Sequence, residues 1–180
     1  MHFLRKVFFL LSITAALPVC SQSPIKLTDQ PIQLEGNTRF TLKVLSPYKI
    51  RVACEGLKRP RFFAKSPDGR LFVTDMYDRS DKKGKIYILE GWNPATKTFD
   101  NVTTYMENLH NPNQVAFYTI NGEHFIYVAE TGKLTYYSYK AGDKQPTSPG
   151  KQIASFPDYG LSYKYGGWHL TRSLAFQNNK

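Results

Sequence analysis

The chain has 180 residues, of which 41% are hydrophobic and 14% aromatic. This length and composition exclude a disordered chain and allow a sizeable core. The formal net charge is +10, but the sequence contains no run of five Lys or Arg residues. We therefore predict no nucleic-acid partner.

The first 21 residues have the pattern of a signal peptide. Arg5 and Lys6 form a basic start, Val7–Leu17 an apolar stretch, and Pro18–Ser21 a small or turn-forming end. Removing residues 1–21 takes away two basic residues and no acid, which lowers the net charge from +10 to +8. The apolar stretch is shorter than the roughly 20 residues that span a bilayer. We expect no transmembrane segment and a periplasmic or secreted protein.

The two cysteines belong to different parts of this pattern. Cleavage after Ser21 would remove Cys20, whereas the alternative is a lipoprotein with a lipid anchor on Cys20. The second reading is weakened because Val19 is not the small residue that precedes a lipidated cysteine. Cys54 is then left without a partner, and we expect it to pack as a small hydrophobe.

Next along the chain we expect a linker at residues 22–39. Two alternating runs follow, Phe40–Val44 and Tyr48–Ala53, and we interpret them as a strand pair.

From residue 55 onward the chain repeats a β-rich unit. Each copy contains an Asp-Gly or Asn-Gly pair between two runs of β-branched and aromatic residues, which indicates a hairpin. Three anchors of the first strand recur after 52 residues, and these are Leu57, Pro60 and Ala64, repeated as Leu109, Pro112 and Ala116. Later anchors drift by a few residues, as loop insertions would cause. A third copy begins at Arg172.

Each copy supplies four antiparallel strands, with the fourth expected at 98–105 and at 151–156. The fold class is therefore predicted to be all-β, a β-propeller with blades at 55–107 and 108–156 and the start of a third at 157–180. A closed propeller needs about four to eight blades. We expect a truncated propeller, the N-terminal part of a longer protein.

In a propeller, the loops after the second strands meet the connections between blades at one end. This end would receive Asp75, Asp78 and Asp81, the turn Glu130–Gly132, His110 with Asn111, and the stretch Tyr163–Arg172. The acidic loop 75–81 lacks the order of a calcium-binding loop and includes Arg79. We interpret this loop as a solvated turn and predict no metal ligand.

His169 and Arg172 are the candidate functional residues. Histidine is the only side-chain type in the stretch Tyr163–Arg172 whose ordinary pKa suits proton abstraction near neutral pH, and His169 is the only histidine there. Arg172 has the geometry to hold a carboxylate with two hydrogen bonds. The alternative is a packed, hydrogen-bonded imidazole and a solvated arginine.

Several segments resemble the glucose/sorbosone dehydrogenase family, most closely its sorbosone dehydrogenase-like members. They are Tyr48–Ala53, Gly56-Leu57, Pro60-Arg61, Ser66–Asp75 and His169–Phe176, and the resemblance covers about residues 42–180. It implies an exported six-bladed propeller that oxidises sugars with pyrroloquinoline quinone and calcium.

The resemblance also implies residue roles. His169 would be the general base that takes the proton of a sugar hydroxyl while hydride passes to the quinone, and Arg172 would lie near the anionic cofactor. Most ligands of the quinone and calcium would lie beyond residue 180, so this chain alone is expected to be inactive. The alternative functions are a calcium-dependent lactonase-like propeller and a non-catalytic carbohydrate-binding propeller.

Overall fold

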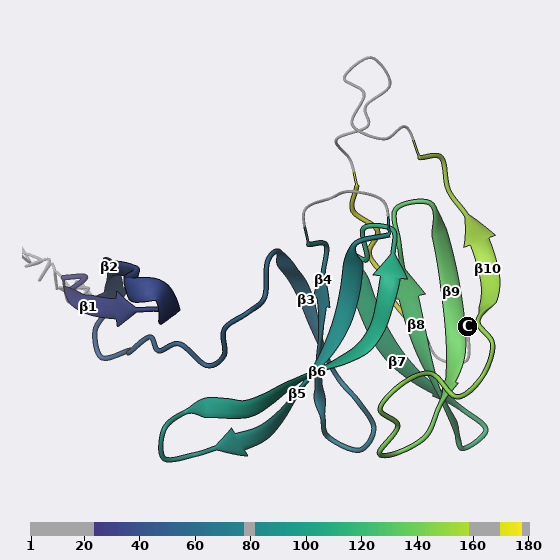
Figure 1. Cartoon of the computed structure of the whole chain (residues 1–180), viewed down its shortest axis with the longest axis horizontal. Coiled ribbons are helices and arrows are strands. Elements are labelled where there is room, and N and C mark those ends of the chain that lie inside the picture. Colours follow the sequence, from purple (N-terminus) through teal and green to yellow (C-terminus); the bar gives the residue numbers. More distant parts are fainter. Residues whose placement is uncertain (1–23, 78–81, 159–169, 178–180) are drawn as a thin grey trace, which may run out of the picture.

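The computed structural model describes residues 24–77, 82–158 and 170–177. These residues form an all-β structure with three antiparallel sheets, and its only helical element is one 3-10 turn, η1 (Glu35–Asn37). One sheet is a two-stranded hairpin and the other two have four strands each; Figure 1 shows the hairpin to one side of the other two sheets. The hairpin contains β1 (Leu27–Gln33) and β2 (Arg39–Leu45). Sheet 1 contains β3 (Pro60–Lys65), β4 (Leu71–Asp75), β5 (Gly84–Asn93) and β6 (Thr98–Leu109). Sheet 2 contains β7 (Gln114–Ile120), β8 (Glu123–Ala129), β9 (Lys133–Tyr139) and β10 (Lys151–Ser155).

The strands of sheets 1 and 2 follow one another in chain order, so every neighbouring pair is antiparallel. This confirms the predicted four strands per unit, including the fourth strands β6 and β10. The two predicted hairpin turns are also confirmed. Gly69 and Gly122 have φ angles of 87° and 83° there, a region that glycine enters without steric cost.

A shared register relates the two sheets. Ala64 of β3 lies opposite Phe72 of β4, and Ala116 of β7 lies opposite Tyr127 of β8. The spacing between alanine and aromatic residue is three residues longer in sheet 2, as the drift of the repeat predicts. Residues that stand the same number of positions from these paired residues are therefore equivalent in the two sheets, whatever the length of the loops between the strands.

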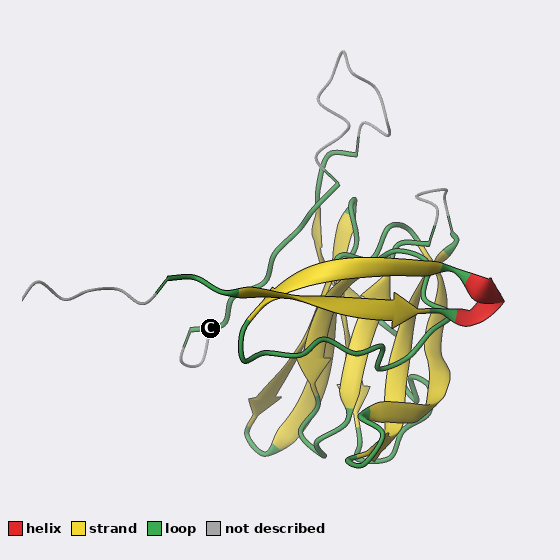
Figure 2. Cartoon of the chain, turned by 90° about the vertical axis from the view of Figure 1, so that its left-hand side faces the viewer, coloured by secondary structure: helices red, strands yellow, loops and turns green. Residues whose placement is uncertain are grey.

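The prediction for the N-terminal segment was confirmed only for Phe40–Val44, which lies in β2. The expected linker 22–39 contains β1, which pairs with β2, and residues 48–53 form no strand. The chain reverses at Gly36, whose φ angle is 72°, so that β2 returns antiparallel along β1. The polar residues of β1 suit an exposed ribbon, as the ion pair between Lys43 and Asp29 at 2.8 Å illustrates. Figure 2 shows this hairpin crossing in front of the sheets.

The main core lies between sheets 1 and 2. We call the side of a sheet that looks toward the next unit along the chain its front face. The front face of sheet 1 carries Ala64, Phe72, Ile86 and Ile88, and it packs against Val115, Phe117, Ile126 and Val128 of sheet 2. The side chain of Phe72 is fully buried and meets the rings of Tyr105, Phe117 and Tyr139 edge to face. Apolar burial and edge-to-face aromatic packing therefore join the two sheets.

A polar network joins the same sheets at the end where the turn between β3 and β4 lies. The Arg70 guanidinium donates to Asp68 at 2.9 Å and to the Tyr139 hydroxyl at 2.6 Å. Burial acts to raise the pKa of Asp68. Hydrogen bonds from Ser66, Tyr139 and the Gly142 N–H, together with the charge of Arg70, outweigh burial and hold this pKa well below its usual range.

Candidate functional site

The upper end of the sheets in Figure 1, where β4, β6 and β8 end, carries a buried carboxylate in each unit. In sheet 1 this is Asp75, which is 0% exposed. It accepts the backbone N–H groups of Lys58, Arg59 and Tyr77 at 2.7–2.8 Å. The expectation that Asp75 belongs to a solvated turn was wrong, because these three donors satisfy the charge inside the protein.

In sheet 2 the matching carboxylate is Glu130, which is 2% exposed. Asp75 and Glu130 each follow the paired aromatic residue by three positions. Glu130 accepts the backbone N–H of His110 at 2.6 Å, and the Lys133 ammonium lies 3.2 Å from its other oxygen. Lys58 and His110 each precede the paired alanine by six positions. Both units therefore use a buried carboxylate to hold the segment that leads into their first strand.

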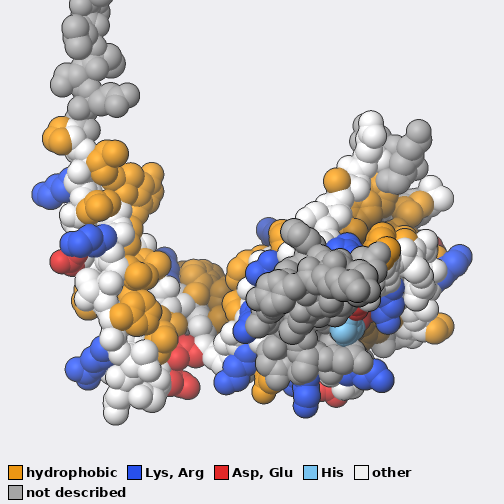
Figure 3. Space-filling model, turned by 90° about the horizontal axis from the view of Figure 1, so that it is seen from above, with side chains coloured by type: hydrophobic (Ala, Val, Ile, Leu, Met, Phe, Trp, Pro, Cys, Tyr) orange, Lys and Arg blue, Asp and Glu red, His pale blue; other side chains and the backbone are white. Residues whose placement is uncertain are grey.

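The His110 side chain meets a second carboxylate. Its Nε2 atom lies 2.6 Å from Oδ2 of Asp158, and the two side chains are 31% and 26% exposed. A carboxylate at this distance fixes the orientation of an imidazole, as the carboxylate of a catalytic triad does. Seen from above, this end presents histidine and acidic side chains near lysine and arginine (Figure 3).

A hollow of about 350 Å³ opens beside His110. Amide, hydroxyl and charged side chains make up most of its lining, which consists of Lys82, Asn108, His110, Glu130, Gly132, Lys133, Gln152 and Ser155. Such a lining offers both donors and acceptors, which suits a small polar ligand.

The same register extends to the third copy of the repeat. His110 and His169 stand six residues before Ala116 and Ala175, so His110–Phe117 aligns with His169–Phe176 at an offset of 59 residues. His169 itself lies outside the described residues. The adjacent Leu170 is buried, and its carbonyl accepts a hydrogen bond from the Thr131 hydroxyl at 3.1 Å. The residue after His169 is thus attached to the turn that follows Glu130.

Arg172 is described, and its guanidinium donates to the carbonyls of Thr171 and Pro157 at 2.9 and 3.0 Å. It also lies over the ring of Phe156, 5.4 Å from the centroid. The aligned position in sheet 2 is Asn113, which is fully buried, and its side-chain amide has no hydrogen-bond partner among the described residues. An unsatisfied buried amide marks a place for water or a ligand group. Binding of the cofactor by Arg172 stays a prediction.

The structure brings together Glu130 and His110, as predicted, and adds Asp158. Sequence reasoning missed Asp158 because its partner lies 48 residues earlier in the chain. The two buried carboxylates could have been found from the sequence, because each unit has an acidic residue three positions after the aromatic residue of its second strand, Phe72 or Tyr127. Cys20, Asp78 and Asp81 lie outside the described residues. Within the described ranges, no group of three His, Cys, Asp or Glu side chains is arranged to hold a metal ion.

In residues 24–77, 82–158 and 170–177, no helix has the length and apolar character needed to cross a membrane. A comparison with protein families found no matching family, and a comparison with curated proteins found no match. The resemblance to glucose/sorbosone dehydrogenases therefore stays a prediction that depends on the residues quoted for it.

Proposed function

We propose that this chain forms part of an exported β-propeller dehydrogenase of the quinoprotein type. It would oxidise a sugar or polyol with pyrroloquinoline quinone as the acceptor. His169 would be the general base that takes the proton of the substrate hydroxyl. The observation that carries the proposal is the alignment of His169 with His110, at the end of the sheets where buried carboxylates hold the connecting segments.

Three structural features support the propeller. Sheets 1 and 2 have the same strand order and register. They pack face to face, with β7 against β3 and β4. Their connecting segments lie at one end, where propellers bind ligands near the axis. The described strands do not close into a ring, so the proposal requires further sheets of the same kind.

The role of His169 is supported by the surroundings of its aligned residue. In His110, the backbone N–H is held by Glu130 and the imidazole is oriented by Asp158. An imidazole in such a frame presents one nitrogen for proton transfer. The role of Arg172 is supported by its aligned residue Asn113. The side-chain amide of Asn113 is buried without a hydrogen-bond partner among the described residues, so this position suits a bound polar group.

The described residues do not by themselves fit the quinone or calcium. They contain no acidic cluster for a calcium ion, and the guanidinium of Arg172 already donates to two carbonyls. We therefore assign to this chain only the proton acceptor and the frame that holds it. In the proposal, other residues of the protein bind both groups.

The test is an assay of sugar-dependent reduction of a redox dye. It is measured on the full-length natural protein that contains this chain, with added quinone and calcium. The His169→Ala variant is expected to lower kcat by about 100-fold or more, because general base catalysis typically contributes that much. His110→Ala is the matched control, and its kcat should change only a few-fold. Unchanged turnover in His169→Ala would remove this residue from the mechanism.

A carbohydrate-binding propeller is the second candidate, and the polar hollow beside His110 favours it. Isothermal titration with sugars distinguishes the two functions. Sugar binding that depends on His110, without dye reduction in the holoprotein, would support the binding function instead of the dehydrogenase.

A further inference from the structure

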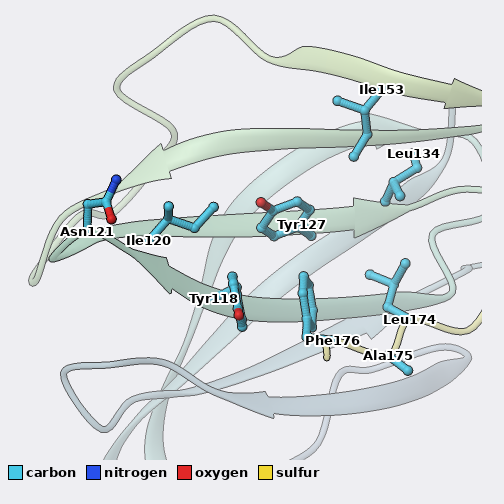
Figure 4. Close-up of a pocket in the computed structure, with 9 residues that line it drawn as sticks. All are labelled: Tyr118, Ile120, Asn121, Tyr127, Leu134, Ile153, Leu174, Ala175 and Phe176. Atoms are coloured by element: carbon cyan, nitrogen blue, oxygen red, sulfur yellow. The ribbon is translucent and has the colours of Figure 1, made fainter. Parts of the chain in front are cut away.

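Two hollows that border sheet 2 differ in the chemistry of their linings. One lies between sheet 2 and residues 174–176 and has a volume of about 540 Å³. Figure 4 shows it lined mainly by aromatic and aliphatic side chains, with Asn121 at one end. The other is the hollow of about 350 Å³ beside His110, whose described lining includes lysine, glutamate, amide and hydroxyl side chains. Of these two hollows, only the second offers charged groups to a ligand.

The carboxylates at the second hollow already have partners. Glu130, which is 2% exposed, accepts the N–H of His110 on one oxygen at 2.6 Å, and its other oxygen lies 3.2 Å from the ammonium of Lys133. The carboxylate of Asp158 lies 2.6 Å from the imidazole of His110. The described lining contains two lysines, Lys82 and Lys133, but only one acidic residue. One ammonium group is therefore in excess.

Lys82 supplies that excess charge. It stands in the loop before β5, and its side chain has no ion-pair or hydrogen-bond partner among the described residues. An uncompensated ammonium group at a concave surface attracts an anion and repels a cation. The hollow is thus suited to a ligand with one negative charge.

The uncharged groups of the lining suit hydroxyl groups of a ligand. The amide nitrogen of Gln152 donates to the Ser155 hydroxyl at 2.7 Å, so the Ser155 O–H and the Gln152 amide oxygen can bond a ligand. The Asn108 amide adds a further donor and acceptor. The volume is at the lower end of the roughly 300–1,000 Å³ of ligand pockets, which suits a single sugar ring.

The hollow is separate from the positions assigned to the cofactor. Asn108 belongs to β6 and Gln152 and Ser155 belong to β10, which are the fourth strands of their sheets. The described lining contains no residue of the first strands β3 and β7, and it does not contain Arg172. A ligand in the hollow would contact the last strands of both sheets.

We propose that this hollow binds a sugar acid, a single polyhydroxylated ring with one carboxylate. The carboxylate pairs with the ammonium groups of Lys82 and Lys133. The ring hydroxyls bond to Asn108, Gln152 and Ser155. This site does not depend on the dehydrogenase reaction of His169, and it narrows the second candidate function, sugar binding, to acidic sugars.

Isothermal titration of the full chain with sodium glucuronate and with glucose tests the site. We expect glucuronate to bind and glucose to bind about tenfold more weakly or not at all, because glucose lacks the charged group that accepts from the two lysines. Equal affinities for the two sugars would overturn the proposal and leave neutral-sugar binding as the function of the hollow. Absence of glucuronate binding would also overturn it.

Lys82→Met tests the charge, and Lys83→Met is the matched control. Both lysines are exposed, so neither change should alter the circular dichroism spectrum, but only Lys82 lines the hollow. Lys82→Met should weaken glucuronate binding about tenfold, whereas Lys83→Met should leave it unchanged. Equal losses in both variants would overturn the proposal by assigning binding to the general charge of the protein.

Glucose 6-phosphate distinguishes the two kinds of anionic sugar. It carries a larger charge than glucuronate on a similar ring, and the hollow has one ammonium group in excess. We expect it to bind no more tightly than glucuronate. Tighter binding that is also lost in Lys82→Met would overturn the assignment to a sugar acid in favour of a sugar phosphate.

Discussion

The front faces of sheets 1 and 2 have the same register but different surroundings. Phe72 on sheet 1 is fully buried beneath rings of both sheets. Tyr127, its equivalent on sheet 2, is half-buried and is covered by Phe176. The difference teaches that each unit is stabilised largely by the unit that follows it, as in other repeat folds. Three experiments test this comparison.

The largest effect should come from truncating the paired aromatic residues. Phe72→Ala is expected to lower the free energy of unfolding by about 4 kcal/mol, because it removes a fully buried ring. Tyr127→Ala should cost only about 1–2 kcal/mol, because one side of its ring has few neighbours to lose. Urea unfolding measures both values. Equal losses would contradict the unequal covering of the two faces.

The next effect concerns the two buried carboxylates. Asp75→Asn should lower the free energy of unfolding by roughly 3 kcal/mol, because one amide oxygen replaces two oxygens that accept three N–H groups. Glu130→Gln should cost about 1 kcal/mol, because Glu130 holds one N–H group besides Lys133. The exposed Asp100 serves as control, and Asp100→Asn should stay within about 0.5 kcal/mol. The reverse order of the first two losses would contradict the assignment of the cost to the number of N–H groups that each carboxylate holds.

The smallest effect depends on pH and concerns the network between the sheets. Asp68 has a folded-state pKa below its unfolded value, so its contribution is complete above the unfolded pKa of about 3.9 and is lost as pH falls toward the folded pKa. Asp68→Asn should therefore cost about 1.5 kcal/mol at pH 7, and the cost should shrink progressively below about pH 4. Thermal unfolding between pH 7 and pH 2 measures this.

Lys144 provides a matched control for that experiment. Its ammonium pairs with Glu90 at 2.6 Å on the surface, and such exposed pairs are worth about 0–1 kcal/mol. Lys144→Ala should have a small effect at neutral pH. A pH-independent cost in Asp68→Asn would show that the carboxylate charge is not what joins the sheets.

The sheet repeat was predictable because its signals are local. Asp68-Gly69 and Asn121-Gly122 specify turns by their own backbone preferences, and alternating β-rich runs specify the flanking strands. The hairpin β1–β2 was missed because Thr28, Asp29 and Gln30 follow no apolar alternation. The pairing of His110 with Asp158 was missed because it depends on where two distant loops meet.

The amino-acid sequence by itself determined an all-β chain with a repeated four-stranded unit and its turns, since these follow from period, turn chemistry and repetition. Only the tertiary structure decided that Asp75 and Glu130 are buried anchors and that Phe176 packs on Tyr127. It also decided that Arg70 joins two sheets. These contacts connect residues far apart in sequence, and their free energy depends on burial and geometry that exist only after the sheets have packed.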